Sequence, residues 1–74
     1  MEFRTKDLGE AGALVTKNVR LLRLENQGEF YWFVFENTGA EKIADDYWNG
    51  DLLVPAKLYN DSLRSLKDRL FAQR

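Results

Sequence analysis

The feature that most constrains the fold is a run of six apolar residues, Phe30 to Phe35, that contains five aromatic rings. The run is far shorter than the ~20 residues of a membrane-spanning helix, and it is rich in residues that favour strands. Successive side chains of a strand point to opposite faces. One face therefore carries Tyr31, Phe33 and Phe35, and the other carries Phe30, Trp32 and Val34.

A second strand precedes this run. Residues 19–24 alternate so that Leu22 and Leu24 share one face, opposite Leu21 and Arg23. Between the two runs lies Asn26-Gln27-Gly28, a three-residue loop with a glycine available for positive φ. The pattern predicts an antiparallel hairpin of residues 19–24 and 30–36.

The first helix is expected to begin near Asp7, which together with Glu10 resembles a capping box. Its apolar residues fall on one face at helical spacing: Leu8, Ala11, Leu14 and Val15. Gly9 and Gly12 weaken helix propensity. We interpret these small residues as allowing the helix to approach a sheet closely.

Two further helices follow the hairpin. Thr38 and Glu41 form a capping-box pattern ahead of a helix that ends at Asn49-Gly50. Pro55 opens the last helix, residues 55–71, in which Leu63, Leu66 and Leu70 form the stripe expected to pack on the hairpin. Residues 2–5 are expected to form a short edge strand with Phe3 inward, and residues 51–54 a further short strand.

These elements indicate one α+β domain spanning residues 1–74, with a small antiparallel sheet packed against three helices. The sheet would consist of the central hairpin plus one or two short strands. Hydrophobic residues make up 45% of the chain and charged residues 31%, a balance typical of a globular domain.

The residue types exclude several chemistries. The chain has no His and no Cys, which removes the usual zinc sites, haem ligands, thiol redox pairs and Ser-His or Cys-His nucleophiles. It has no GxGxxG and no Walker-type loop. Acid–base work would fall to carboxylates, Lys or Tyr. We considered Lys6, Asp7, Tyr31, Tyr47 and Tyr59, and their spacing requires no such role.

A metal site is not expected either. Asp45, Asp46 and Asp51, with Glu41 one turn earlier, are of the ligand type that Mg²⁺ or Ca²⁺ prefers. Their spacing matches no EF-hand loop, and adjacent helix residues point about 100° apart. We interpret them as a solvated acidic helix face. The sequence thus predicts no enzyme activity and no cofactor.

Charge is distributed unevenly along the chain. Residues 24–54 carry one cation, Lys42, against seven carboxylates, whereas both terminal segments are net positive. Such segregation produces either one acidic and one basic surface or ion pairs between the segments. The last helix is basic, with Lys57, Arg64, Lys67 and Arg74. We favour an amphipathic packing helix over a DNA-binding one, because the element order does not match a helix-turn-helix frame.

The second face of the aromatic strand is the candidate interaction face, formed by Phe30, Trp32, Val34 and, from the first strand, Arg23. Three interpretations remain open. The first is a core covered by other elements, and the second is a homodimer interface. The third is a surface whose rings stack the bases of single-stranded nucleic acid while Arg23, Arg20 and Arg4 contact phosphates. A pI near 5.3 disfavours the last.

Several short segments resemble a family of small bacterial and phage-associated domains of unknown function. They are Phe3–Leu8, the small-residue helix after it, Phe33–Glu36, and Val54–Ala56 opening a Leu-rich helix. The resemblance implies a prokaryotic or phage accessory protein and no particular site.

The functional expectation is therefore a non-catalytic interaction protein that self-associates as a dimer, with another, unidentified protein partner also possible. The alternative is a single-stranded nucleic-acid-binding module. Because the sequence has no spanning segment and no signal-like start, we expect a cytoplasmic protein without membrane contact.

Overall fold

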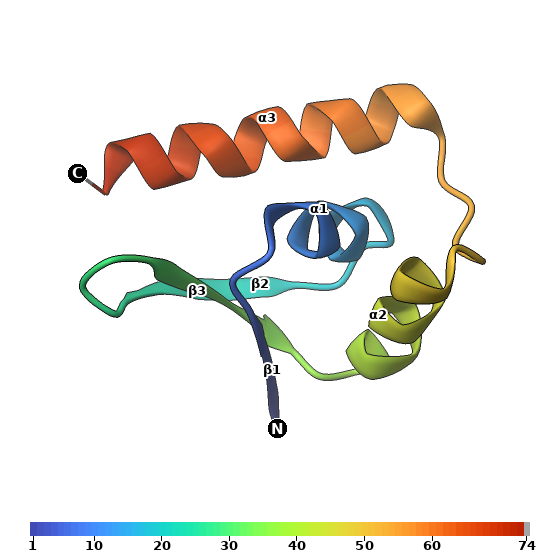
Figure 1. The fold of residues 1–74 in the computed structure, drawn as a ribbon, viewed down its shortest axis with the longest axis horizontal. Coiled ribbons are helices and arrows are strands. Elements are labelled where there is room, and N and C mark those ends of the chain that lie inside the picture. Colours follow the sequence, from blue (N-terminus) through green and yellow to red (C-terminus); the bar gives the residue numbers. More distant parts are fainter. Residues whose placement is uncertain (74) are drawn as a thin grey trace.

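The computed structural model describes residues 1–73 and has an α+β fold. It consists of three helices and one three-stranded antiparallel sheet (Figure 1). In chain order the elements are β1 (Glu2–Thr5), α1 (Leu8–Thr16), β2 (Leu21–Asn26), β3 (Tyr31–Glu36), α2 (Ala40–Asn49) and α3 (Ala56–Ala72). No helix in this described part of the chain has the length and apolar character needed to cross a bilayer.

The aromatic strand β3 occupies the centre of the sheet, whose strand order is β1-β3-β2. Phe3 of β1 pairs with Phe35, and Thr5 pairs with Phe33, which places these residues on the face that α1 covers. A central strand is covered by neighbours on both edges and by side chains on both faces. This position explains why β3 is apolar from Tyr31 to Phe35.

Strand β2 departs from the expected alternation because it contains a β-bulge. The register shifts between Leu21, which pairs with Phe35, and Arg23, which pairs with Val34. The extra residue is Leu22, which is exposed, whereas Leu21 and Leu24 both pack against the core. The prediction that Leu22 shares a face with Leu24 is therefore wrong, since a bulge breaks the two-residue period.

The hairpin loop is one residue longer than expected, running from Gln27 to Phe30. The Gln27 N–H donates to the Phe30 carbonyl at 2.9 Å, and the Asn26 side chain accepts from the Gly28 N–H at 2.7 Å. Gly28 has a φ of 92°, a conformation that costs glycine little. The glycine-dependent turn is confirmed.

Helix α1 is capped by Asp7, whose carboxylate accepts the Glu10 N–H at 2.8 Å. The capping box is only half formed, because the Asp7 N–H donates to the Thr5 hydroxyl instead of to Glu10. The α2 capping box is absent. Gly39, at φ 91°, is the residue before the helix and makes no side-chain cap, so Thr38 has no capping role. Gly50 ends α2 in the left-handed conformation, as expected.

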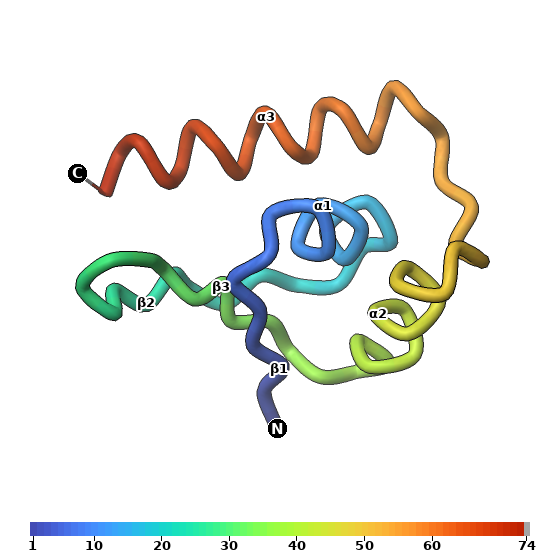
Figure 2. Tube along the Cα trace, viewed as in Figure 1, coloured from blue at the N-terminus to red at the C-terminus, as the bar shows by residue number. Residues whose placement is uncertain are grey.

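Helix α1 lies between the sheet and α3, with α2 beside it (Figure 2). A Cβ added to Gly12 would meet the Leu63 side chain at 2.6 Å, and one added to Gly9 would collide with the Tyr47 hydroxyl. The glycines therefore permit close approach of the neighbouring helices, and the expectation that they serve contact with the sheet is wrong. The core cluster consists of Ala11, Leu14, Val19, Phe33, Phe35, Ala40 and Leu66.

The last helix packs on α1 and not on the hairpin as predicted. Leu66 is 2% exposed and belongs to the core cluster, whereas Leu70 is only partly buried. The helix C-terminus reaches the hairpin through the Tyr31 hydroxyl, which donates to the Gln73 carbonyl at 3.2 Å. Residues 51–54, expected as a further short strand, connect α2 to α3 without joining the sheet.

Candidate interaction site at the hairpin end

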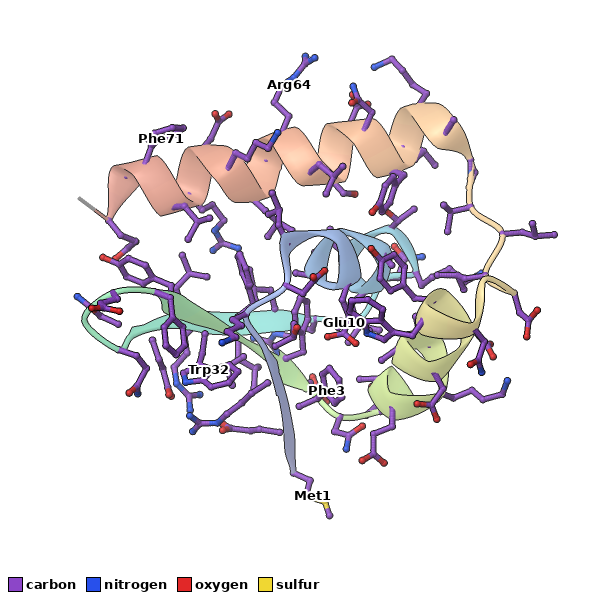
Figure 3. The ribbon with its side chains drawn as sticks, in the orientation of Figure 1. Met1, Phe3, Glu10, Trp32, Arg64 and Phe71 are labelled. Atoms are coloured by element: carbon purple, nitrogen blue, oxygen red, sulfur yellow. The ribbon has the colours of Figure 1, made fainter. Side chains whose placement is uncertain are left out.

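The four residues of the expected interaction face differ in their exposure. Val34 is 0% exposed and is therefore not available to a partner, which corrects the prediction that it lies on an open apolar surface. Trp32 is partly buried on the side of the sheet away from α1 (Figure 3). Phe30, in the hairpin loop, is 36% exposed. Arg23 flanks Val34 on β2.

Val34 is surrounded by four charged side chains, Glu2 and Arg4 from β1 and Arg23 and Glu25 from β2, which we call the charged lattice. Arg4 reaches across β3 to Glu25 at 2.6 Å, and Arg23 reaches back across it to Glu2 at 2.9 Å. Arg23 also binds Glu25 at 2.7 Å. The aliphatic stems of such long side chains cover apolar surface while their charged ends stay in water.

The lattice shifts the proton affinities of its members. The hydrogen bond from Arg23 holds the pKa of Glu2 below its ordinary value. Hydrogen bonds to Glu2 and then Glu25 raise the pKa of Arg23. Arg4 and Arg23, the two arginines that flank Val34, are thus both bound to carboxylates. Of the three arginines considered for contact with phosphates, only Arg20 forms no ion pair within residues 1–73.

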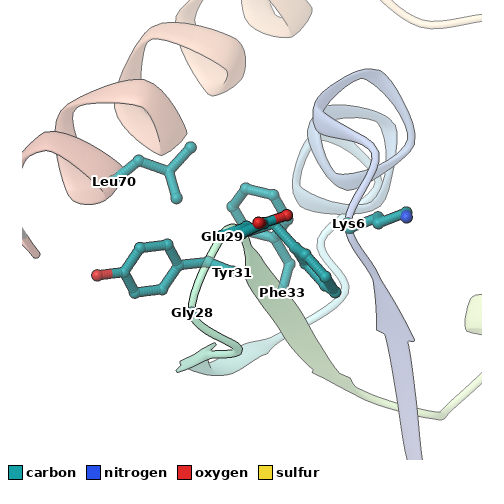
Figure 4. A pocket seen from close by; sticks show the side chains of 7 residues that line it. Lys6, Gly28, Glu29, Tyr31, Phe33 and Leu70 are labelled. Atoms are coloured by element: carbon teal, nitrogen blue, oxygen red, sulfur yellow. The ribbon is translucent and has the colours of Figure 1, made fainter.

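A recess lies at the hairpin end, between the loop and the C-terminal part of α3 (Figure 4). This hairpin-end cleft has a volume of about 420 Å³, within the range of ligand-sized pockets. Its lining comprises Lys6, Gly28, Glu29, Phe30, Tyr31, Phe33 and Leu70. The lining is therefore mixed, with three aromatic rings and a leucine beside polar surface that includes Lys6 and Glu29.

The cleft is shaped by contacts on three sides. Leu70 extends from α3 toward the Tyr31 ring, and the Tyr31–Gln73 hydrogen bond ties the two elements together (Figure 4). The Phe30 ring stands edge-on to Trp32 with 5.3 Å between centroids. The Lys6 ammonium lies 4.9 Å from the centre of the Phe30 ring, a cation–π distance. Phe30 is thus held at the mouth of the cleft.

The cleft also carries two opposite charges, Lys6 and Glu29. Both residues are exposed, and neither forms a salt bridge with another residue of the described chain. Sequence reasoning did not single out this site. The local pattern contains no signal for it, because the cleft depends on where α3 lies relative to the hairpin.

A second cluster joins the three helices. The Tyr59 hydroxyl donates to the Gly9 carbonyl at 3.1 Å, and Trp48 donates its indole N–H to Glu10 at 2.6 Å. Burial, followed by the neighbouring Tyr59, raises the pKa of Tyr47. Of the residues considered for acid–base work, Asp7, Tyr47 and Tyr59 come together here. Asp7 caps α1 and Tyr59 binds α1 backbone, so these two groups hold helices in place.

The acidic residues of α2 do not converge. Asp46 binds Lys42 at 2.8 Å, which raises the pKa of Lys42. Within residues 1–73 no group of three or more carboxylates is placed to hold a metal ion.

The basic helix α3 pairs within itself, through Lys57 and Asp61 at 2.8 Å. Arg64 points away from the rest of the molecule (Figure 3). The candidate basic residue Arg74 lies outside the described residues. The sequence left open whether the segregated charges form ion pairs between segments or separate charged surfaces. Ion pairs between segments form where Arg4 and Arg23 meet Glu25. No ion pair joins the acidic α2 to the basic α3 in the described chain.

Comparisons with protein-family models, with curated proteins and with solved structures find no match to this chain. The fold and the geometry of its surfaces are therefore the basis for a functional proposal.

Proposed function

We propose that the protein is a non-catalytic interaction module that self-associates as a dimer through the hairpin-end cleft. The observation that carries the proposal is a recess lined in part by aromatic rings, together with two opposite charges that form no salt bridge within residues 1–73. An interface between identical copies must be complementary to itself. A partly exposed ring beside a recess and a cation near a carboxylate support such self-complementarity at the hairpin end.

The shape argument rests on Phe30 and the adjoining recess. A partly exposed ring beside a hollow of about 420 Å³ is a projection next to a depression. Two copies related by a twofold axis can each place the projection against the other's depression. Aromatic rings are enriched at the centres of such interfaces, where water is excluded.

The charge argument rests on Lys6 and Glu29. A twofold axis through the cleft turns one copy so that its ammonium faces the other copy's carboxylate, which yields two equivalent ion pairs. Such pairs contribute little affinity when exposed, and they disfavour incorrect orientations of the two copies. Self-association thus gives each charge an ion-pair partner, which neither has among residues 1–73.

The charged lattice makes the outer face of the sheet a poorer interface than the hairpin end. Docking there would desolvate Glu2, Arg4, Arg23 and Glu25, and their interactions are already satisfied within the chain. This argument moves the proposed contact from the middle of the sheet to its hairpin end. It also leaves fewer free arginines for a nucleic-acid interface.

The cellular setting belongs to the same proposal. The resemblance to small bacterial and phage-associated domains supports an accessory role in a prokaryotic or phage context, and the composition supports a cytoplasmic location. A dimeric accessory module of this kind would present any further binding surface twice.

The test is the mass of the protein in solution after Phe30→Glu. We expect wild-type protein to scatter light as a dimer, at twice the chain mass of 8.7 kDa, and Phe30→Glu to scatter as a monomer. Phe71→Glu is the matched control, because it places the same charge on an exposed phenylalanine of α3 away from the cleft (Figure 3). A dimer that survives Phe30→Glu, or a wild-type monomer at millimolar concentration, contradicts the proposal.

The nucleic-acid alternative requires one more variant, Trp32→Glu. A base-stacking surface predicts salt-dependent binding of a short single-stranded oligonucleotide that Trp32→Glu abolishes without a change of mass. The dimer proposal predicts no oligonucleotide binding by any of the variants.

A further inference from the structure

Trp48, at the end of α2, is an exposed aromatic side chain in a fixed position. It is 61% exposed, yet its indole N–H donates at 2.6 Å to Glu10, which is only 7% exposed. Its ring stands edge-on to Tyr47 with 5.0 Å between centroids. The polar end of the indole is thus satisfied inside the molecule, and the outward surface is the ring itself. Rings held in this way lose little conformational entropy when a partner binds.

The charged residues that share the Trp48 face of α2 are both carboxylates. Glu41, Asp45 and Trp48 follow each other at helical spacings of four and three, so they lie along one face of α2. Glu41 and Asp45 are exposed and form no salt bridge with any other described residue. The only cation of α2, Lys42, is bound to Asp46.

We propose that Glu41, Asp45 and Trp48 form a docking surface for a lysine or arginine side chain on a basic segment of a partner protein. The face of an indole ring attracts cations, and Trp is the strongest of the aromatic residues in this respect. The two carboxylates add an attractive field that steers a cationic segment toward the ring. The aliphatic stem of Lys or Arg then packs on the ring while its charged end reaches Asp45.

The basic helix of a second copy is a less suitable occupant. Lys57 is already bound to Asp61, and Asp68 lies one turn after Arg64, so the cations of α3 are interspersed with carboxylates. The docking surface also lies at the opposite end of the long axis from the hairpin (Figure 1). The proposed dimer contact and a basic partner can therefore be bound at the same time.

The experiment follows the Trp48 indole N–H signal by NMR while a synthetic peptide of four lysines separated by serines is added. The Trp48 signal is assigned by its loss in Trp48→Phe. We expect a saturable shift of this signal with the lysine peptide and none with a peptide that carries glutamates at the same positions. The Trp32 indole N–H signal, at the other end of the molecule, should not move.

Two matched variants separate a specific surface from general charge attraction. Asp45→Asn and Asp68→Asn remove the same charge from exposed helical positions. We expect Asp45→Asn to weaken binding of the lysine peptide by about three- to fivefold, the effect of an exposed charge contact, and Asp68→Asn to leave it unchanged. Trp48→Leu should abolish saturable binding while the remaining amide signals keep their folded dispersion.

The proposal is overturned if the two Asn variants weaken binding equally, since the peptide then responds only to net charge. It is also overturned if wild-type protein shows no saturable shift at millimolar peptide. A shift that appears with rising protein concentration alone, without peptide, would identify a second copy as the occupant and would likewise contradict a basic partner.

Discussion

The two faces of the central strand β3 are both buried, but by different kinds of cover. On one face Phe33 and Phe35 pack against Leu14 and Ala11 of α1 within the main core. On the other face Val34 is equally inaccessible, although no helix lies over it and its neighbours are the charged lattice. The first cover is apolar and fixed in place by packing, whereas the second is a network of long side chains in contact with water.

This difference shows how a three-stranded sheet can close its outer face without a partner. Because the arginines cross over β3 in opposite directions, each edge strand is linked to the other. Neither cover extends to the hairpin loop, where Phe30 stays partly exposed. The site available to a partner is therefore the end of the sheet and not its middle.

The largest expected effect comes from breaking the apolar cover. Phe35→Ala removes a ring that is fully buried in the main core, and we expect the free energy of unfolding to fall by about 3–5 kcal/mol. Urea denaturation followed by circular dichroism measures this change. For a domain of this size the variant would be unfolded or nearly so. A loss below about 1 kcal/mol would show that the core has been wrongly located.

The corresponding change on the outer face is expected to be smaller. Val34→Ala removes two methyl groups, which at ~0.8 kcal/mol each corresponds to a loss of about 1.5 kcal/mol. The stems of Arg4 and Arg23 can settle into the space that is left, so little further cost for a cavity is expected. If Val34→Ala proves as damaging as Phe35→Ala, the outer face is as rigid as the core and the comparison fails.

The smallest effect concerns the charges themselves. The pKa of Glu2 is lower in the folded protein than in the unfolded chain, because Arg23 binds its carboxylate. Its contribution to stability is therefore present above the ordinary carboxyl pKa of 4.5 and is lost as the pH falls through the folded value. We expect Glu2→Gln to reduce the dependence of Tm on pH in this acidic range. High salt should diminish the difference between the two proteins. Identical pH profiles would mean that the lattice has no energetic role.

Much of the fold follows from local patterns in the sequence. The hairpin with Gly28, the Asp7 cap of α1, the edge strand with Phe3 and the buried Leu66 are all confirmed. These features depend on residues close together in the chain, where side-chain period and capping chemistry act directly. The predicted boundaries of the strands were less accurate: β2 begins at Leu21 and β3 at Tyr31, each later than the alternation of residues predicted.

The parts that escaped prediction depend on contacts between distant segments. Alternation alone cannot show that Leu22 is the extra residue of a bulge, nor that Arg4 and Arg23 extend over Val34. Helical periodicity identified the buried stripe of α3 without showing that it faces Gly12 of α1. The hairpin-end cleft was missed for the same reason, since Lys6 and Leu70 meet there only in the folded chain.

The central claim is that the hairpin end is complementary to itself, and a charge exchange at its rim tests that claim most directly. Lys6→Glu gives a rim with two negative charges, and Glu29→Lys gives a rim with two positive charges. Each variant should repel its own copies and scatter light as a monomer, while an equimolar mixture should recover the dimer mass, because unlike charges then face each other across both halves of the interface. If both variants remain folded and the mixture stays monomeric, or if either variant alone stays dimeric, the twofold contact through Lys6 and Glu29 is contradicted.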